Sequence, residues 1–183
     1  MRVWPGDLMR RLRHRVRWGA HLHTLLMLAA VLLAAHFWQT RHVPRGAAPE
    51  FSALAVSAQD GAVLTLAQWR AAHPGQPVAL HFWAEWCPIC KLEEHSVSRV
   101  ARDWPVLTVA MRSGDVPAVR RVLAQRALPW ATVVDPDGAL AERYGFRAVP
   151  AFVAIGADGR IRATSVGYTS ELGMRLRLWW ARW

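Results

Sequence analysis

The sequence predicts an α/β domain in which strands and helices alternate along the chain. Short apolar stretches recur through residues 51–183, and segments with helical periodicity lie between them. One of these stretches, residues 77–83, is apolar on both faces, which is typical of a strand in the centre of a covered sheet. The length of 183 residues, of which 53% are hydrophobic, suits one such domain and an additional segment.

The expected elements follow one another in a regular order. Strands are predicted at residues 63–66, 77–83, 106–111, 131–134, 151–155 and 160–166, and helices at residues 67–72, 87–103, 115–127, 139–144 and 170–180. Asp115 and Pro117 are typical of the first turn of a helix. The last two strands flank Asp158-Gly159 and are expected to form a hairpin. The sheet is therefore expected to close with an antiparallel pair of strands and a terminal helix.

The only two cysteines of the chain, Cys87 and Cys90, lie three positions apart directly after the central strand. At the start of a helix, unpaired N–H groups and the positive end of the helix dipole favour the thiolate form of the first cysteine. Pro88 fits the first turn, where its missing N–H costs nothing. We expect Cys87 to be the nucleophile of a dithiol/disulfide redox centre, and Cys90, which is further in and less exposed, to be the resolving thiol.

Other uses of a cysteine pair need further residues. A structural zinc site needs four ligands, usually a second Cys/His pair, and the sequence has no second pair. A covalent c-type haem needs His after the second cysteine, where Lys91 stands. Copper binding by both thiols with a helper such as His95 or Met111 stays open, and so does an inert structural disulfide. The favoured redox centre needs no metal and no cofactor other than the Cys87–Cys90 disulfide.

Most of the positive charge lies beside an apolar segment. The net charge is +10, and residues 1–48 contribute +7 of it through eight arginines and Asp7. Residues 22–38 are apolar over about the length of a bilayer-spanning helix, and six arginines precede them. This arrangement predicts a transmembrane anchor behind a basic cytoplasmic segment at residues 1–21, and it argues against nucleic-acid binding. A cleaved signal peptide is the alternative, with the small residues 46–48 as a poorly placed cleavage site.

Residues 39–50 contain Pro, Gly and Ala, and we expect them to form a short linker to the domain of residues 51–183. By the positive-inside rule the N-terminus stays in the cytoplasm and the domain is exported. We therefore expect a single-pass protein of the inner membrane, in contact with the lipid bilayer, with its catalytic domain in the periplasm. The arginines and indoles of residues 175–183 fit either an interfacial membrane helix or the last helix of the fold.

Two motifs of the chain resemble thioredoxins. The stretch from Phe82 to Cys87 is similar to the strand and active-site segment of that family. The stretch from Tyr144 to Pro150 is similar to the family's loop before a cis-proline. The resemblance covers the chain from about residue 50 to the C-terminus, and it implies a thioredoxin-like α/β fold and a protein disulfide oxidoreductase activity.

The two motifs lie further apart than in plain thioredoxins, because a strand and a helix at residues 106–134 are inserted between them. This resembles the membrane-anchored, exported branch that includes cytochrome c maturation thioredoxins. Within that branch, residues 110–115 and 167–180 most resemble the suppressor-of-copper-sensitivity D proteins, which are anchored periplasmic disulfide oxidoreductases. The resemblance also keeps a copper-binding or copper-tolerance module as the alternative function.

By the same resemblance, Pro150 is expected in the cis form beside the reactive sulfur. A cis bond before proline costs little, and here it leaves the backbone of Val149 free to pair with an extended substrate segment. Trp86 offers a flat surface for an apolar substrate or packs against the first helix, and both roles stay open. The substrate-binding residues are thus expected to be Trp86, Pro88, Val149 and Pro150.

His81 departs from the family pattern, because thioredoxins carry a buried acid at the position before Phe82-Trp83. By resemblance, that acid shuttles the proton of the inner thiol, and a histidine can do the same because its pKa lies near neutrality. The alternative for His81 is a buried neutral imidazole held by one hydrogen bond.

Together these observations predict an anchored periplasmic thiol:disulfide oxidoreductase. Its expected partners are thiol or disulfide proteins of the periplasm and a membrane electron donor. Reduction of partner disulfides is the favoured direction, because an oxidised exterior already forms disulfides. Pro88 is similar to the residue found in oxidising members, so oxidation stays open. A non-catalytic scaffold is a further alternative.

Overall fold

The computed structural model describes residues 21–35, 38, 40–56 and 61–183. The chain divides into two compact units, Met1–Gln39 and Thr40–Trp183, which are described separately. Residues 21–35 of the first unit form a helix on which every side chain is exposed. Among the described residues, no helix combines the length and the apolar character that a membrane crossing requires. The anchor predicted at residues 22–38 is thus left unsupported. Residues 1–20 of the predicted basic segment lie outside the described part of the chain.

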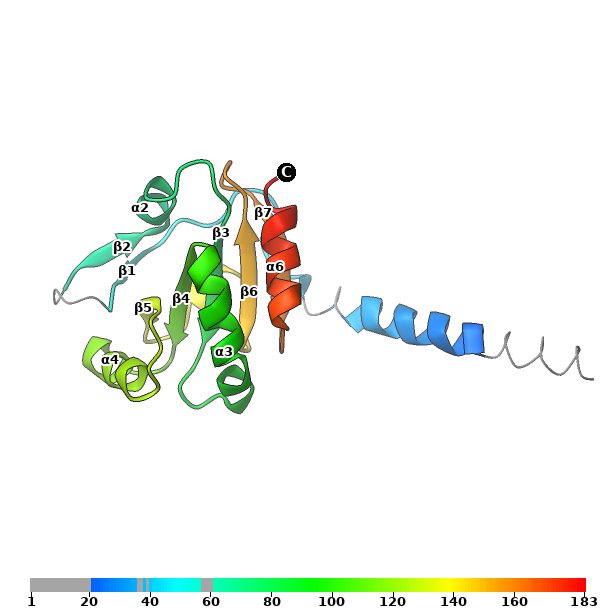
Figure 1. The fold of residues 1–183 in the computed structure, drawn as a ribbon, viewed down its shortest axis with the longest axis horizontal. Helices are drawn as coiled ribbons and strands as arrows, with labels where there is room; N and C mark the ends of the chain where they lie inside the picture. Colours follow the sequence, from blue (N-terminus) through cyan, green and yellow to red (C-terminus); the bar gives the residue numbers. More distant parts are fainter. Residues whose placement is uncertain (1–20, 36–37, 39, 57–60) are drawn as a thin grey trace, which may run out of the picture. The chain divides into compact units, whose positions relative to one another are not determined.

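The second unit is built on a five-stranded sheet in the order β5-β4-β3-β6-β7 (Figure 1). Its strands are β3 (Val78–Trp83), β4 (Val106–Met111), β5 (Ala131–Asp135), β6 (Ala151–Ile155) and β7 (Ile161–Val166). Strands β3, β4 and β5 run parallel, whereas β6 and β7 form an antiparallel hairpin beside β3. Every residue of β3 is buried, which confirms the predicted central strand. The pairing of β6 with β7 confirms the predicted hairpin.

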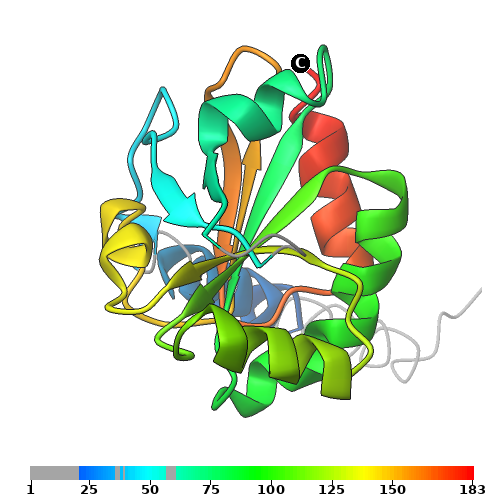
Figure 2. The ribbon, with the colours of Figure 1, turned by 90° about the vertical axis from the view of Figure 1, so that its left-hand side faces the viewer.

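Helices cover both faces of this sheet. In the described part of the unit they are α2 (Leu66–Ala71), α3 (Pro88–Asp103), α4 (Val116–Gln125), α5 (Ala139–Arg143) and α6 (Glu171–Trp180). Asp115 caps α4 by accepting from the N–H of Ala118, as its sequence position predicts. Apolar residues of α3, α4 and α6 pack on one face, and those of α2 and α5 pack on the other. Figures 1 and 2 show α3 and α6 side by side on the first face.

A second, two-stranded sheet differs from the prediction. Strand β1 (Ser52–Leu54) pairs antiparallel with β2 (Val63–Thr65), and the sequence indicates only the second of these strands. Strand β2 ends earlier than expected because Thr65 caps α2, with its side chain accepting from the N–H of Gln68.

The segment before β1 packs on the domain, so the predicted linker at residues 39–50 is corrected. Val43 is buried, and Ala47 forms a β-bridge with Arg160 just before β7. The folded unit therefore begins at Thr40. Small residues and prolines are typical of linkers, but here they let the chain lie close against an edge strand.

Strand β3 positions the candidate site because its side chains alternate between the two faces of the sheet. Leu80 and Phe82 belong to the apolar cluster that α2 and α5 cover. Trp83 belongs to the other cluster, which also contains Cys87 and Cys90. The chain therefore passes from the central strand directly to a helix whose first turn carries both cysteines.

Candidate active site

Cys87 caps helix α3. Its sulfur accepts a hydrogen bond from the N–H of Cys90 at 3.1 Å, and its backbone is extended (φ −86°, ψ 110°), as a residue in the N-cap position requires. Pro88 occupies the first turn, as predicted. The two cysteines form a disulfide, with their Cα atoms 5.3 Å apart. In the reduced form, the N–H groups and dipole of α3 favour a thiolate at Cys87.

Both cysteines are shielded from solvent. Cys87 is 3% exposed and Cys90 is 2% exposed, so the second cysteine is only marginally less exposed than the first. The loop before β6 covers Cys87, because the carbonyl oxygen of Val149 lies 3.6 Å from the Cys87 sulfur. Trp86 and Pro88, on either side of Cys87, are exposed. A partner therefore meets these flanking residues before it reaches the sulfur.

The peptide bond between Val149 and Pro150 is cis, as the sequence predicts. The N–H of Gly167 donates to the carbonyl oxygen of Pro150 at 2.8 Å, and this bond holds the end of the loop. Pro150 is buried and Val149 is half-buried. The backbone of Val149 thus borders the disulfide formed by Cys87.

Trp86 has one fixed edge and a large exposed surface. Its Nε1–H donates to the carbonyl oxygen of Arg112 at 3.1 Å, and the residue is 59% exposed. The preceding residue is held to the same segment, because the N–H of Glu85 donates to the hydroxyl of Ser113 at 2.9 Å. The indole is therefore a positioned apolar surface next to Cys87.

His81 lies in the middle of the sheet and is 1% exposed. Among the described residues, neither of its ring nitrogens has a hydrogen-bond partner. Thr108, its neighbour on β4, instead bonds the hydroxyl of Thr132 at 2.7 Å. Burial lowers the pKa of His81 to about 3, so the imidazole is neutral near pH 7. The structure thus contains a buried neutral imidazole without the single hydrogen bond that the sequence analysis expects for it.

Glu93 is a buried acid that the sequence analysis did not identify. It lies one turn after Cys90 on α3, is 1% exposed, and accepts the N–H of Thr169 with its Oε1. Its Oε2 lies 4.0 Å from Nε2 of His81. Burial raises the pKa of Glu93 to about 7, although the N–H of Thr169 acts in the opposite direction. A carboxyl group that titrates near neutrality therefore lies one helical turn from the second cysteine.

The three-residue spacing from Cys90 is the signal that could reveal Glu93, because positions i and i+3 lie on the same side of a helix. In the sequence, Glu93 is part of a polar stretch that begins at Lys91 and is typical of an exposed helix surface. Its burial depends on Thr169, which is 76 positions away in the chain. No local pattern indicates that contact.

The proposed copper helpers are not gathered around the cysteines. Met111 packs in the apolar cluster on the opposite face of the sheet from Cys87 and Cys90. His95 lies on the exposed side of α3. Within the described part of the chain, no group of three or more His, Cys, Asp or Glu side chains is arranged to hold a metal ion.

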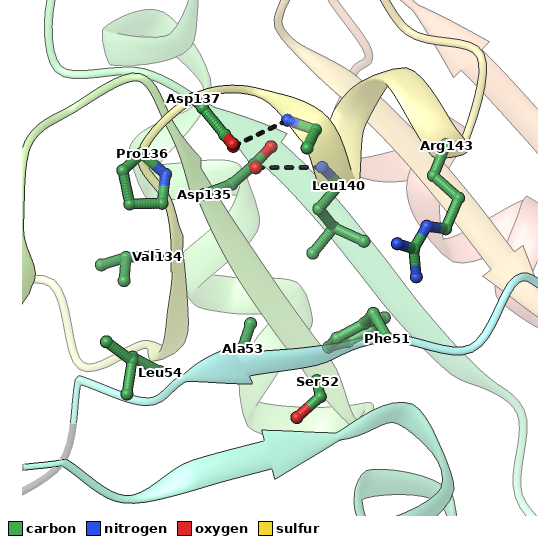
Figure 3. Close-up of a pocket in the computed structure, with 11 residues that line it drawn as sticks. Phe51, Ser52, Ala53, Leu54, Val134, Asp135, Pro136, Asp137, Leu140 and Arg143 are labelled. Atoms are coloured by element: carbon green, nitrogen blue, oxygen red, sulfur yellow. Dashed lines mark hydrogen bonds between the residues drawn. The ribbon is translucent and has the colours of Figure 1, made fainter.

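Figure 3 shows a pocket of about 280 Å³ between β1 and the turn before α5. Asp135 and Asp137 line it, and both accept hydrogen bonds from N–H groups in the first turn of α5. Asp135 accepts from the N–H groups of Leu140 and Ala141, and Asp137 accepts from that of Ala139. The residues described above as the candidate site do not line this pocket. Its acids therefore serve the fold and are separate from the dithiol.

Known proteins are similar to this domain in fold and in sequence. A thioredoxin-like protein of Haemophilus influenzae is 32% identical over 107 residues, which cover 58% of this chain and 64% of that protein. The thiol:disulfide interchange protein DsbE of Allochromatium vinosum is 30% identical over 95 residues, which cover 51% and 52%. The crystal structure of a secreted disulfide oxidoreductase of Mycobacterium tuberculosis has a TM-score of 0.57 and 29% identity, over 70% of this chain and 93% of that one.

These similarities confirm the predicted thioredoxin-like α/β fold. The chain spans less than two thirds of the length of the two curated relatives. The family model described as Redoxin matches residues 44–174. Because that match extends over more than half of the chain, the protein belongs to the Redoxin family.

Proposed function

We propose that the protein is a thiol:disulfide oxidoreductase that exchanges electrons with partner proteins through Cys87 and Cys90. The observation that carries this proposal is the position of Cys87 at the N-cap of α3, where its sulfur accepts the N–H of Cys90. This end of the helix stabilises a thiolate, and a thiolate is the attacking species in disulfide exchange. The relatives named as a thiol:disulfide interchange protein and a disulfide oxidoreductase support the same activity.

Reduction of a partner proceeds in two exchange steps. The Cys87 thiolate attacks one sulfur of the partner disulfide, forms a mixed disulfide and releases the other partner sulfur as a thiolate. The Cys90 thiolate then attacks the Cys87 sulfur, which forms the Cys87–Cys90 disulfide and releases the second partner thiolate. Two electrons pass from the dithiol to the partner, and the released thiolates take up protons. Oxidation of a partner dithiol is the reverse sequence.

Cys90 has to lose a proton before the second attack, and we propose that the carboxylate of Glu93 accepts it. A carboxyl group with a pKa of about 7 accepts and releases a proton near neutral pH. The shuttle role predicted for His81 passes to Glu93, because an imidazole with a pKa of about 3 remains neutral. His81 then acts as a positioning residue, 4.0 Å from the carboxylate that takes the proton.

We propose that the protein is anchored in the inner membrane through residues 22–38 and that its domain reduces partner disulfides in the periplasm. The six arginines before these residues support an anchor, and so do the exposed apolar side chains of the helix at residues 21–35. The secreted M. tuberculosis relative supports an exported domain. A membrane electron donor would restore the dithiol, because an oxidising compartment does not. The partners are thiol or disulfide proteins of that compartment.

The activity is tested by measuring how fast Cys87 is alkylated as a function of pH, in the full chain carrying Cys90→Ala. We expect half-maximal reactivity well below pH 8.5, the usual value for a free cysteine. In the matched control, Cys87→Ala, the remaining thiol of Cys90 should be alkylated more slowly, because Cys90 lies inside the helix and not at its N-cap. An unreactive Cys87 with an ordinary midpoint would falsify the proposal.

The direction is tested in cells that export the domain. Cys90→Ala should trap partners as mixed disulfides with Cys87, since the resolving thiol is missing. For the unaltered protein, a reduced Cys87–Cys90 pair supports the reductase and a fully oxidised pair supports an oxidase. Loss of the reduced pool when the membrane donor is removed would support the proposed electron source.

A further inference from the structure

Helix α6 has apolar side chains on two opposite sides. On its inner side, Met174 and Leu178 are fully buried in the core. Its outer side, together with Trp183 just after the helix, carries an apolar surface that we call the α6 stripe, between 51% and 79% exposed and made of Leu172, Leu176, Trp179, Trp180 and Trp183. At 3.6 residues per turn, the four positions inside the helix lie within about 100° of its circumference. The outer side of a helix in a soluble domain is ordinarily polar, so this surface calls for a partner.

Two arginines on α6 and just after it border the stripe. Arg177 donates to the backbone carbonyl oxygens of Thr164 and Gly173. The guanidinium of Arg182 stacks over Trp104, 4.5 Å from the ring centroid. Neither guanidinium takes part in the ion pairs found in the described part of the domain. These two cations therefore have no acid partner among the described side chains, whereas Arg175 on the same helix pairs with Asp103 and Glu171.

The stripe and the segment where the chain joins the domain lie at the same edge of the sheet, although Val43 of that segment packs on the opposite face from α6. The N–H of Ile161 donates to the carbonyl oxygen of Gly46, so the joining segment runs beside the start of β7. Helix α6 packs on β6 and β7, and Figure 1 shows it at the same edge of the sheet. Because the folded unit begins at Thr40, few residues of the chain separate it from the proposed anchor at residues 22–38.

We propose that the α6 stripe docks on the surface of an anionic lipid bilayer. Indoles favour the interface between headgroups and hydrocarbon, and arginines at that depth attract anionic headgroups. A second copy of the chain fits the stripe less well, because a two-fold contact would bring the bordering arginines against one another. The proposal goes beyond the dithiol activity, and it relies on the proposed anchor only to hold the domain within reach of the lipid.

The test uses the full chain, labelled with fluorotryptophan and reconstituted in vesicles of phosphatidylglycerol and phosphatidylcholine that contain a lipid with a nitroxide headgroup. Fluorine NMR resonances are assigned with Trp→Phe variants. The resonances of Trp180 and Trp183 should broaden by about twofold or more, because their indoles lie near the nitroxide. The resonance of Trp130, which is 6% exposed in the core, should not change.

A pair of matched variants separates the stripe from exposed apolar surface in general. Trp180→Gln should reduce the broadening at Trp183, whereas Val63→Gln on β2 should not. Trp180 and Val63 are 61% and 50% exposed, so neither change should unfold the domain. Vesicles of phosphatidylcholine alone should give less broadening than the anionic vesicles. Equal broadening in both would overturn the assignment of an anionic surface.

Flotation of the same vesicles measures the anchor separately. If the chain floats and the indoles of the stripe stay sharp, the docking proposal is wrong and the anchor stands. If the chain does not float, docking fails together with the anchor, while the dithiol activity is unaffected. Broadening without nitroxide lipid, together with a doubled mass, would show that a second copy covers the stripe and would overturn the proposal.

Discussion

The two faces of the five-stranded sheet bury different kinds of side chain. The face under α2 and α5 is packed with apolar and aromatic residues, among them Leu80, Phe82 and Leu107, which are fully buried. The face under α3 and α6 also has an apolar core, but it additionally contains His81 and Glu93, both 1% exposed. Burial of polar groups without full hydrogen bonding is unfavourable. One face therefore serves stability alone, while the other gives up some stability for groups that can react.

Neighbouring residues of the same strand belong to different faces, because side chains alternate along β3. Phe82 lies between His81 and Trp83 in the sequence but packs against Tyr144 and Phe146 on the opposite side. Substitutions on the two faces should thus separate the free energy of unfolding from the rate of disulfide exchange. Three substitutions test this separation, in order of decreasing effect on stability.

The largest loss of stability is expected on the apolar face. Leu107→Ala should lower the free energy of unfolding by about 3–5 kcal/mol, because it removes buried apolar surface and leaves a cavity. Denaturant-induced unfolding measures this change. In the absence of denaturant, the folded variant should reduce a disulfide-linked peptide at the rate of the unaltered protein. A clear slowing of that reaction would break the distinction between the faces.

Glu93→Gln should change both the pH dependence of the free energy of unfolding and the rate at which the mixed disulfide is resolved. The folded protein holds a proton on Glu93 up to a pKa of about 7, whereas the unfolded chain releases it near 4.5. Stability from this group is therefore present at low pH and is lost as the pH rises from about 4.5 to about 7, by up to about 3 kcal/mol. In Glu93→Gln this decline should disappear from unfolding curves measured across that range.

The same variant should slow resolution of the Cys87 mixed disulfide by on the order of 100-fold near pH 7, since Cys90 loses its proton acceptor. Rapid-quench measurement of resolution and of mixed-disulfide formation separates the two steps. Glu94→Gln is the matched control, because Glu94 is the next residue and pairs with Arg126 instead. An equal slowing by both variants would remove the special role of Glu93.

His81→Leu should have the smallest effect on stability near pH 7, where the imidazole is largely neutral in both the folded and the unfolded chain. The pKa of His81 falls from 6.5 to about 3 on folding, so the unfolded chain binds a proton that the folded protein does not. This contribution to stability is present above about pH 6.5 and is lost as the pH falls toward about 3, and the variant should not show that loss. Resolution of the mixed disulfide should slow more than its formation, by about threefold, because Glu93 loses its neighbour. Equal effects on both steps in a rapid-quench experiment would reject a role for His81 in proton transfer.

Features with a local cause were predictable from the sequence. The start of α3 at Cys87 follows from the strand before it and from Pro88 after it, and the turn at Asp158-Gly159 produces the hairpin. Features that depend on distant contacts were not. Strand β1 is defined by its pairing with β2, and the segment around Ala47 looks like a linker until it is seen beside Arg160.

By itself the sequence determined the order of elements and the dithiol at the end of the central strand, because each depends on residues that are close together in the chain, whereas the cis-proline loop was implied by the resemblance to thioredoxins. Only the tertiary structure shows that Glu93 is a buried acid next to His81. The N–H of Thr169 reaches Glu93 from the start of α6, and His81 reaches it from β3. Burial by segments far apart in the chain sets the protonation of these groups, and no local pattern records it.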